Sequence, residues 1–169
     1  PAEQILRWDP VARSLSCFRY PSRKAHGLRF DPAGRLLMCE GGAGQVTRLD
    51  LKSGLLQILA QAYRTFPLAA PTDLDFDSQG RIYFSSRPGA AAPSEGNVNA
   101  VYRLDRSRKV VQVLAYPEVH MPNGVVISPD DKTLFLIEAH PDANHHRDLR
   151  AYPIDENGDL GAPRIVHDF

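Results

Sequence analysis

The segment "NGVVISPDDKTLFLIE" at residues 123–138 decides how this chain must fold. It consists of an alternating apolar run, a tight polar turn and a second apolar run, which is typical of a β-hairpin. Two further segments repeat this pattern, "HGLRFDPAGRLLMCE" at residues 26–40 and "TDLDFDSQGRIYFSS" at residues 72–86. The three segments begin 46 and 51 residues apart. The chain therefore contains an internal repeat that is built from hairpins.

A second series of hairpins alternates with the first. Short apolar runs ending at Asp50, Asp105 and Asp155 each lead through a polar turn into another apolar run. Each repeat therefore holds four short strands at a period of roughly 40 to 50 residues, which is typical of a β-propeller blade. Apolar runs of this length, broken by Gly and Pro, argue against helices. We predict an all-β fold, a β-propeller with about three and a half four-stranded blades of a probable six-bladed ring.

The repeat also predicts the domain organisation. We expect residues 1–169 to be part of a single β-propeller domain. Residues 1–20 would form the outer strands of one blade, and whole blades would occupy residues 21–62, 63–116 and 117–169. Such an arc leaves a blade face open at each end. The missing blades would come from the rest of a longer chain or from a second copy.

Composition excludes several classes of partner. Hydrophobic residues make up 43% of the chain and charged residues 24%, which is ordinary for a soluble globular protein. Twenty basic and twenty acidic residues cancel, so the chain lacks the charge of a nucleic-acid binder. No apolar run approaches the ~20 residues that cross a bilayer. We expect no nucleic-acid or membrane partner, and either a cytoplasmic or a periplasmic or secreted location. Cys17 and Cys39 fit no metal-ligand spacing, and we expect two buried thiols.

Loop lengths predict which side of the propeller carries the site. Strands in a blade alternate in direction, so the loops fall on two opposite rims. We term the rim where each innermost strand begins the upper rim. Long loops such as residues 86–97 and 139–148 fall there, whereas the turns of the lower rim are short. Function concentrates in long loops held by a rigid scaffold, so we expect the site at the upper rim.

Polar residues begin the three innermost strands at this rim. These residues are His26, Thr72 with Asp73, and Asn123. We expect their side chains to face the central channel at one level. The small residue Gly124 would let the backbone crowd at that point.

Two other groups of polar residues reach the upper rim. Glu40 and Glu138 end second strands and would suit acid–base chemistry as a pair, although structural roles are the simpler interpretation. The stretch that holds His140, His145 and His146 suggests zinc, because imidazole is a common metal ligand. Its spacing matches no structural zinc site, so a solvated loop is the simpler interpretation here as well.

Residues 123–138, followed by "DLRAYPIDENGDLGAPRIVHDF", resemble the SMP-30/gluconolactonase/LRE-like family of six-bladed propellers. The resemblance covers nearly the whole chain and is strong from about His26 onward. Family members are metal-dependent lactonases or related esterases with one divalent cation, often calcium or zinc, at the top of the channel. The resemblance implies that Asn123 is a metal ligand and that Thr72, Asp73 and His26 contact substrate. It assigns no catalytic residue, because the other expected ligands have no counterpart in this chain.

Three functions remain open at this point. The resemblance implies a calcium- or zinc-dependent lactonase that hydrolyses a sugar lactone or related ester in carbohydrate metabolism. Thr72 and His26 stand where the family usually has Asn, which fits two alternatives. One alternative is a metal-dependent esterase acting on a non-sugar ester. The other is a non-catalytic propeller that binds ligands or proteins.

Overall fold

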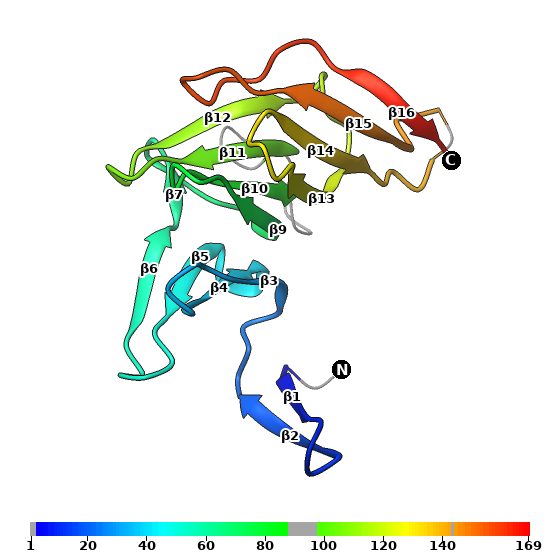
Figure 1. The fold of residues 1–169 in the computed structure, drawn as a ribbon. Helices are drawn as coiled ribbons and strands as arrows, with labels where there is room; N and C mark the ends of the chain where they lie inside the picture. Colours follow the sequence, from blue (N-terminus) through cyan, green and yellow to red (C-terminus); the bar gives the residue numbers. More distant parts are fainter. Residues whose placement is uncertain (1–2, 88–97, 143) are drawn as a thin grey trace.

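The computed structural model describes residues 3–87, 98–142 and 144–169, and these consist almost entirely of antiparallel strands (Figure 1). Three four-stranded sheets follow one another. The first contains β3 (Ala25–Phe30), β4 (Leu36–Glu40), β5 (Gln45–Leu49) and β6 (Leu56–Ala60). The second contains β9 (Ala70–Phe76), β10 (Ile82–Arg87), β11 (Ala100–Leu104) and β12 (Val110–Ala115). The third contains β13 (Pro122–Ile127), β14 (Thr133–Glu138), β15 (Asp148–Pro153) and β16 (Arg164–Asp168).

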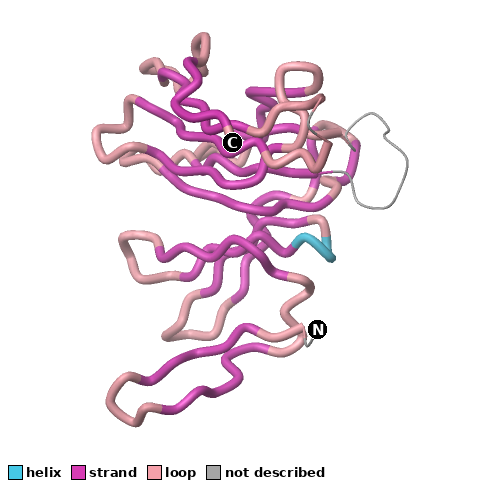
Figure 2. The backbone as a smooth tube through the Cα atoms, turned by 90° about the vertical axis from the view of Figure 1, so that its right-hand side faces the viewer, coloured by secondary structure: helices cyan, strands magenta, loops and turns pink. Residues whose placement is uncertain are grey.

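Smaller elements precede and connect these sheets. One hairpin pairs β1 (Ile5–Asp9) with β2 (Ser14–Arg19), and another pairs β7 (Ala62–Tyr63) with β8 (Phe66–Pro67). A short 3-10 helix, η1 (Gly41–Ala43), is the helical segment visible in Figure 2. Within the described ranges, no helix is both long enough and apolar enough to cross a membrane.

The order of strands within each sheet follows the order of the chain, as in successive blades. Figures 1 and 2 both place the β1–β2 hairpin and the β13–β16 sheet at opposite ends of the row of sheets. The all-β prediction is confirmed. Each four-stranded sheet lies within one of the predicted segments, and the role of β1–β2 as outer strands of another blade stays a prediction. Most of the long loop predicted at residues 86–97 lies outside the described residues.

The short turns of the lower rim close the inner hairpins as the sequence predicts. Gly34 and Gly80 each adopt φ 75° and donate their N–H to the carbonyls of Asp31 and Asp77. The third turn places Asp131 at the same position with φ 60°. Asp is one of the few residue types besides Gly that tolerate this left-handed conformation. The turn geometry is therefore kept although the residue changes.

Apolar layers between consecutive sheets form the core. One layer, between the first and second four-stranded sheets, contains Leu37, Phe84 and the fully buried Cys39. The next layer, between the second and third sheets, contains Tyr83 and Leu136. The second sheet, β9–β12, is therefore covered on its two faces by its neighbours, as a propeller blade is.

The prediction of two buried thiols is wrong for Cys17. Its side chain is exposed, whereas Cys39 is buried. Cys17 lies on β2, and most residues of the β1–β2 hairpin are exposed. Within the described residues, no sheet covers the outer face of this hairpin.

The innermost strands β3 and β9 approach each other closely at Gly27. Strand β9 lies between β3 and β13. A Cβ atom on Gly27 would lie 2.7 Å from the Asp73 Cα atom and 2.9 Å from the Thr72 carbonyl oxygen. A Cβ atom on Gly124 would meet only the Ile137 side chain, at 3.4 Å. The backbone crowding predicted at Gly124 therefore lies at Gly27, because of these two glycines only Gly27 faces a neighbouring backbone that leaves no room for a side chain.

This difference predicts unequal effects of two similar substitutions. Gly27→Ala should lower the free energy of unfolding by about 1–3 kcal/mol, because strand β9 must move away to make room. Gly124→Ala, the matched control, should cost clearly less, since a flexible side chain can give way. Urea unfolding of the longest available form of the protein measures both. Equal unfolding midpoints for the two variants would contradict this account of the strand packing.

Candidate functional site

The structure brings all four residues predicted for the site to one open pocket at the upper rim. The pocket has a volume of about 430 Å³. Its lining comes from β3, β9, β13 and the ends of β10 and β14: His26, Gly27, Thr72, Asp73, Arg87, Asn123, Gly124 and Ile137. This size suits a small organic ligand. The ligand and substrate-contact roles of His26, Thr72, Asp73 and Asn123 stay predictions.

A buried serine fixes the backbone at Asn123. The Ser85 hydroxyl donates to the Asn123 carbonyl oxygen at 2.6 Å and accepts the Asp73 N–H at 3.2 Å. Ser85 is fully buried, so it ties the middle of β9 to the start of β13 away from water. Among the described residues, none hydrogen-bonds to the side-chain amide of Asn123. That amide is half-buried at the pocket wall and is available to a ligand.

The carboxylate of Asp73 has a structural task besides lining the pocket. Its Oδ2 atom accepts the N–H of Val125 on the neighbouring innermost strand at 3.0 Å. Its Oδ1 atom lies 2.7 Å from the position that a Cβ on Gly27 would take. One oxygen therefore holds β13, while the other lies at the close approach of β3 and β9.

The pocket also contains a cation that the sequence analysis missed. The Arg87 Nε atom donates to the Thr72 hydroxyl oxygen at 3.4 Å, and that hydroxyl donates to the Ala70 carbonyl at 3.0 Å. Arg87 directly follows the strand-end residue Ser86. This position is the only feature of the sequence that could have indicated Arg87 as a pocket residue. Thr72 is buried, and its hydroxyl already has two hydrogen-bond partners, the Ala70 carbonyl and Arg87.

The two strand-end glutamates do not form a pair. Glu40 is fully buried and binds Arg19 at 2.8 Å and the amides and hydroxyls of its own sheet, Gln45 at 2.6 Å and Thr47 at 3.2 Å. Glu138 is also buried and accepts the N–H groups of His120 and Met121 with one oxygen. Neither lines the pocket around Asn123. Their contacts fit the structural interpretation.

Glu138 should be important for stability. Burial raises the pKa of its carboxyl above the ordinary value of 4.5, and the two backbone N–H groups oppose that effect. We expect Glu138→Ala to lower the free energy of unfolding by about 2–3 kcal/mol, because both N–H groups lose their acceptor. Glu138→Gln keeps an acceptor oxygen and should unfold close to the unaltered protein. The exposed Glu118→Ala is the control, and an unfolding midpoint shared by Glu138→Ala and Glu118→Ala would contradict the prediction.

The histidine-rich loop folds its rings onto a fourth histidine. The rings of His120 and His146 stack with centroids 3.8 Å apart, and the Nδ1 atoms of His120 and His145 lie 3.3 Å apart. The rings of His140 and His145 lie 3.9 Å apart. The solvated-loop interpretation is therefore incomplete, because these three loop rings are half-buried. His120 was missed, since it lies 20 residues or more before its partners in the chain.

Two rings of this cluster, His120 and His146, should titrate below the usual range of histidine. Burial, followed by the neighbouring imidazoles and Arg150, lowers the pKa of His120 below 6.5. Burial and Arg150 also lower the pKa of His146, against the opposing effect of Asp148. The folded state thus resists protonation, so stability present above pH 6.5 should fall as the pH drops below it.

Ring NMR between pH 5 and 8 measures both midpoints in the folded protein. We expect them below 6.5 for His120 and His146. His145→Ala removes one like-charged neighbour and should raise the midpoint of His120. Midpoints at or above 6.5 would show that the packed ring cluster does not persist in solution.

Comparison with known proteins agrees with the resemblance read from the sequence. The family described as SMP-30/Gluconolactonase/LRE-like region matches residues 1–169. The chain belongs to this family. A gluconolactonase of Zymomonas mobilis is 24% identical over 191 residues, which cover 100% of this chain and 51% of that protein. The lactonohydrolase oryL of Aspergillus oryzae is 30% identical over 147 residues, which cover 79% of this chain and 34% of that protein.

Solved structures share the propeller fold of this SMP-30/gluconolactonase/LRE-like chain. A gluconolactonase of Xanthomonas campestris has a TM-score of 0.82 at 24% identity, covering 97% of this chain and 55% of that one. A calcium-binding regucalcin of Agrobacterium tumefaciens has a TM-score of 0.70 at 16% identity, covering 97% and 52%. A chain of a nidogen/laminin complex has a TM-score of 0.71 at 14% identity, covering 99% and 59%. The chain spans between 34% and 59% of the length of these proteins.

The residues of this family member allow one test of the expected metal. Asn123 offers an amide oxygen with no partner among the described residues, and such a hard donor suits calcium. Among the described residues, no group of three or more His, Cys, Asp or Glu side chains could hold a metal ion. The Asn123 amide oxygen is therefore a suitable single donor for a divalent ion, and its role as a ligand stays a prediction.

Proposed function

We propose that the protein containing this chain is a divalent-metal-dependent lactonase that hydrolyses a sugar lactone or related ester. The observation that carries the proposal is the pocket that gathers His26, Thr72, Asp73 and Asn123 where three innermost strands begin. Relatives named gluconolactonase and lactonohydrolase support a lactone as the class of substrate. The calcium-binding regucalcin with the same fold supports a divalent cation.

Four of the pocket residues would have tasks in this reaction. Hydrolysis adds water across the ester C–O bond of the lactone and yields a hydroxy acid. A bound calcium or zinc ion supplies Lewis-acid chemistry toward the ester carbonyl. Asn123 would hold that ion through its side-chain oxygen, while Ser85 keeps the Asn123 backbone in place. Thr72 and Asp73 would contact the substrate from β9, and His26 from the exposed start of β3.

Other groups would complete the site. The remaining metal ligands and the carboxylate that activates water would come from outside residues 1–169. They would belong to the missing blades, in the rest of a longer chain or in a second copy.

A second candidate is a metal-dependent esterase that acts on a non-sugar ester. The observation that favours it is the pair of Thr72 and Arg87 in the pocket wall, where a buried hydroxyl and a cation meet. A cation at this position favours a substrate that carries negative charge. A non-catalytic binding propeller is the alternative in which the pocket holds a ligand and no metal.

An assay on the longest available form of the protein tests the proposal. Lactone hydrolysis is measured with calcium, with zinc and with EDTA, beside the variant Asn123→Ala. We expect EDTA to abolish activity and Asn123→Ala to lower it about 100-fold, because a metal ligand is lost. Calorimetric titration with the metal alone should show weaker binding to the same variant. The matched control is Asn157→Ala, an exposed asparagine in a lower-rim turn.

The outcomes separate the candidates. Activity that resists EDTA, or metal affinity unchanged in Asn123→Ala, would contradict the assignment of Asn123. Metal-dependent turnover of aryl esters without turnover of sugar lactones would favour the esterase. Absence of hydrolysis in a protein shown to be a closed ring would favour the binding propeller.

A further inference from the structure

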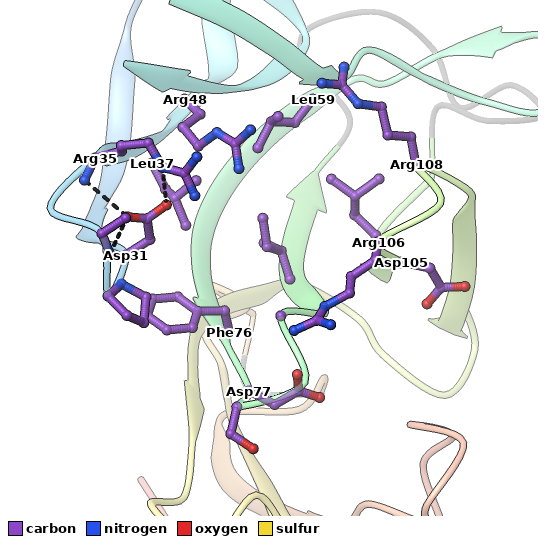
Figure 3. Close-up of a pocket in the computed structure, with 16 residues that line it drawn as sticks. Asp31, Arg35, Leu37, Arg48, Leu59, Phe76, Asp77, Asp105, Arg106 and Arg108 are labelled. Atoms are coloured by element: carbon purple, nitrogen blue, oxygen red, sulfur yellow. Dashed lines mark hydrogen bonds and ion pairs between the residues drawn. The ribbon is translucent and has the colours of Figure 1, made fainter. Parts of the chain in front are cut away.

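A second cavity lies at the lower rim, between the β3–β6 and β9–β12 sheets (Figure 3). Its volume is about 410 Å³, and it is more enclosed than the upper-rim pocket. Loop lengths in the sequence do not indicate this cavity, because short turns line its mouth. The apolar side chains that line it come from the core between the two sheets: Leu37, Leu59, Phe76, Ile82 and Leu104.

The charges at the mouth of this cleft do not cancel. Three carboxylates line it, but each is paired: Asp31 with Arg35, Asp77 with Arg81 and Asp105 with Arg103. Three further guanidinium groups line the cleft, from Arg48, Arg106 and Arg108. Among the described residues, none of these three forms an ion pair with a carboxylate. The cleft therefore carries an excess of positive charge above an apolar floor.

The hydrogen-bond donors of Arg48 are only partly satisfied. One of its Nη atoms donates to the Gln57 side chain at 2.7 Å, but its buried Nε atom has no hydrogen-bond partner. Burial and the nearby Arg35 and Arg108 lower the pKa of Arg48, against the effect of Asp31. In Figure 3, Arg48 and Arg106 extend into the cleft from opposite sides.

The turn that carries Arg108 is also costly. Arg108 adopts φ 65°, a left-handed conformation, and the equivalent turn of the next repeat uses Gly158 there. A long cation at this position carries a backbone cost that glycine avoids. Its Nη1 atom donates to the Ile58 carbonyl of the facing sheet at 3.1 Å. The side chain thus bridges the cleft between two blades.

An oxyanion would relieve the electrostatic cost of placing these cations together. Guanidinium groups present several N–H donors in a planar fork that suits carboxylate and phosphate oxygens. Such a group would accept hydrogen bonds from the guanidinium groups that line the cleft and would offset the repulsion between them. An apolar body attached to it would cover the floor formed by residues such as Leu37 and Ile82, which is favourable.

We propose that the lower-rim cleft binds a small organic oxyanion, with its phosphate or carboxylate at Arg48 and Arg106 and its apolar body on the floor. This site shares no residue with the upper-rim pocket, so it does not depend on the proposed lactonase. Both blades that form it lie within this chain.

Calorimetric titration of the longest available form of the protein tests the cleft. The probes are phenyl phosphate, benzoate, inorganic phosphate and the neutral benzyl alcohol. We expect phenyl phosphate or benzoate to bind more tightly than inorganic phosphate, and benzyl alcohol to bind weakest. If phenyl phosphate binds more tightly than benzoate, the preferred head group is a phosphate, and the reverse order identifies a carboxylate. Arg48→Gln and the exposed Arg106→Gln should each weaken binding about tenfold or more, as for lost charged hydrogen bonds.

The control variant is Lys52→Gln, which removes an exposed lower-rim charge outside the cleft. It should leave binding unchanged. Arg106 is exposed, so its substitution tests the site without disturbing the core. Equal binding by Arg106→Gln and the unaltered protein would overturn the proposal, as would benzyl alcohol binding as tightly as the anions. Absence of binding by every probe would overturn it too.

Discussion

Two carboxylates on β9 hold the described blades together where they meet. Asp73 accepts the N–H of Val125 at 3.0 Å, and Asp75 accepts the N–H of Ile127 at 2.9 Å. An innermost strand has an open edge, and its N–H groups need acceptors other than a further strand. Hydrogen bonds to charged groups contribute about 1.5–3 kcal/mol each. Strand β9 thus joins the second sheet to the third at the centre of the arc.

The same strand contacts the first sheet on its other side. Arg29 Nε lies 3.1 Å from Asp75 Oδ1, an ion pair that lacks the geometry of a hydrogen bond. Gly27 lets the two backbones meet closely. The pocket residues therefore lie on strands whose separation is set by the buried carboxylates of β9 and by the absence of a side chain at Gly27. This rigidity matters for a site assembled from three blades, because small displacements of a ligand weaken binding.

The sequence predicted what depends on local pattern. The alternation of residues 72–86 and the Asp-led turns predicted strands, hairpins and the period, and the first residues of the inner strands predicted the pocket lining. It could not predict contacts between blades. In the sequence Ser85 is an ordinary small strand residue, and its hydrogen bond to the Asn123 carbonyl exists only in the folded structure. His120 likewise contacts His145 only because the loop that carries His145 folds back onto it. Such roles depend on distances between repeats, which one-dimensional periodicity does not contain.

Comparison of the repeats distinguishes residues that set the backbone conformation from residues that supply chemical groups. Where they agree, as in the turns at Asp31 and Asp77, the shared residues set backbone conformation. Where they differ, the scaffold position is the same but the chemical group changes. One strand start offers the hydroxyl of Thr72 and another the amide of Asn123, while one outer turn carries Arg108 where the next has glycine. A ring of identical repeats would offer an asymmetric ligand several equivalent orientations, and repeats that differ select one of them. The departures from the repeat at each rim are therefore where binding and reaction should be sought.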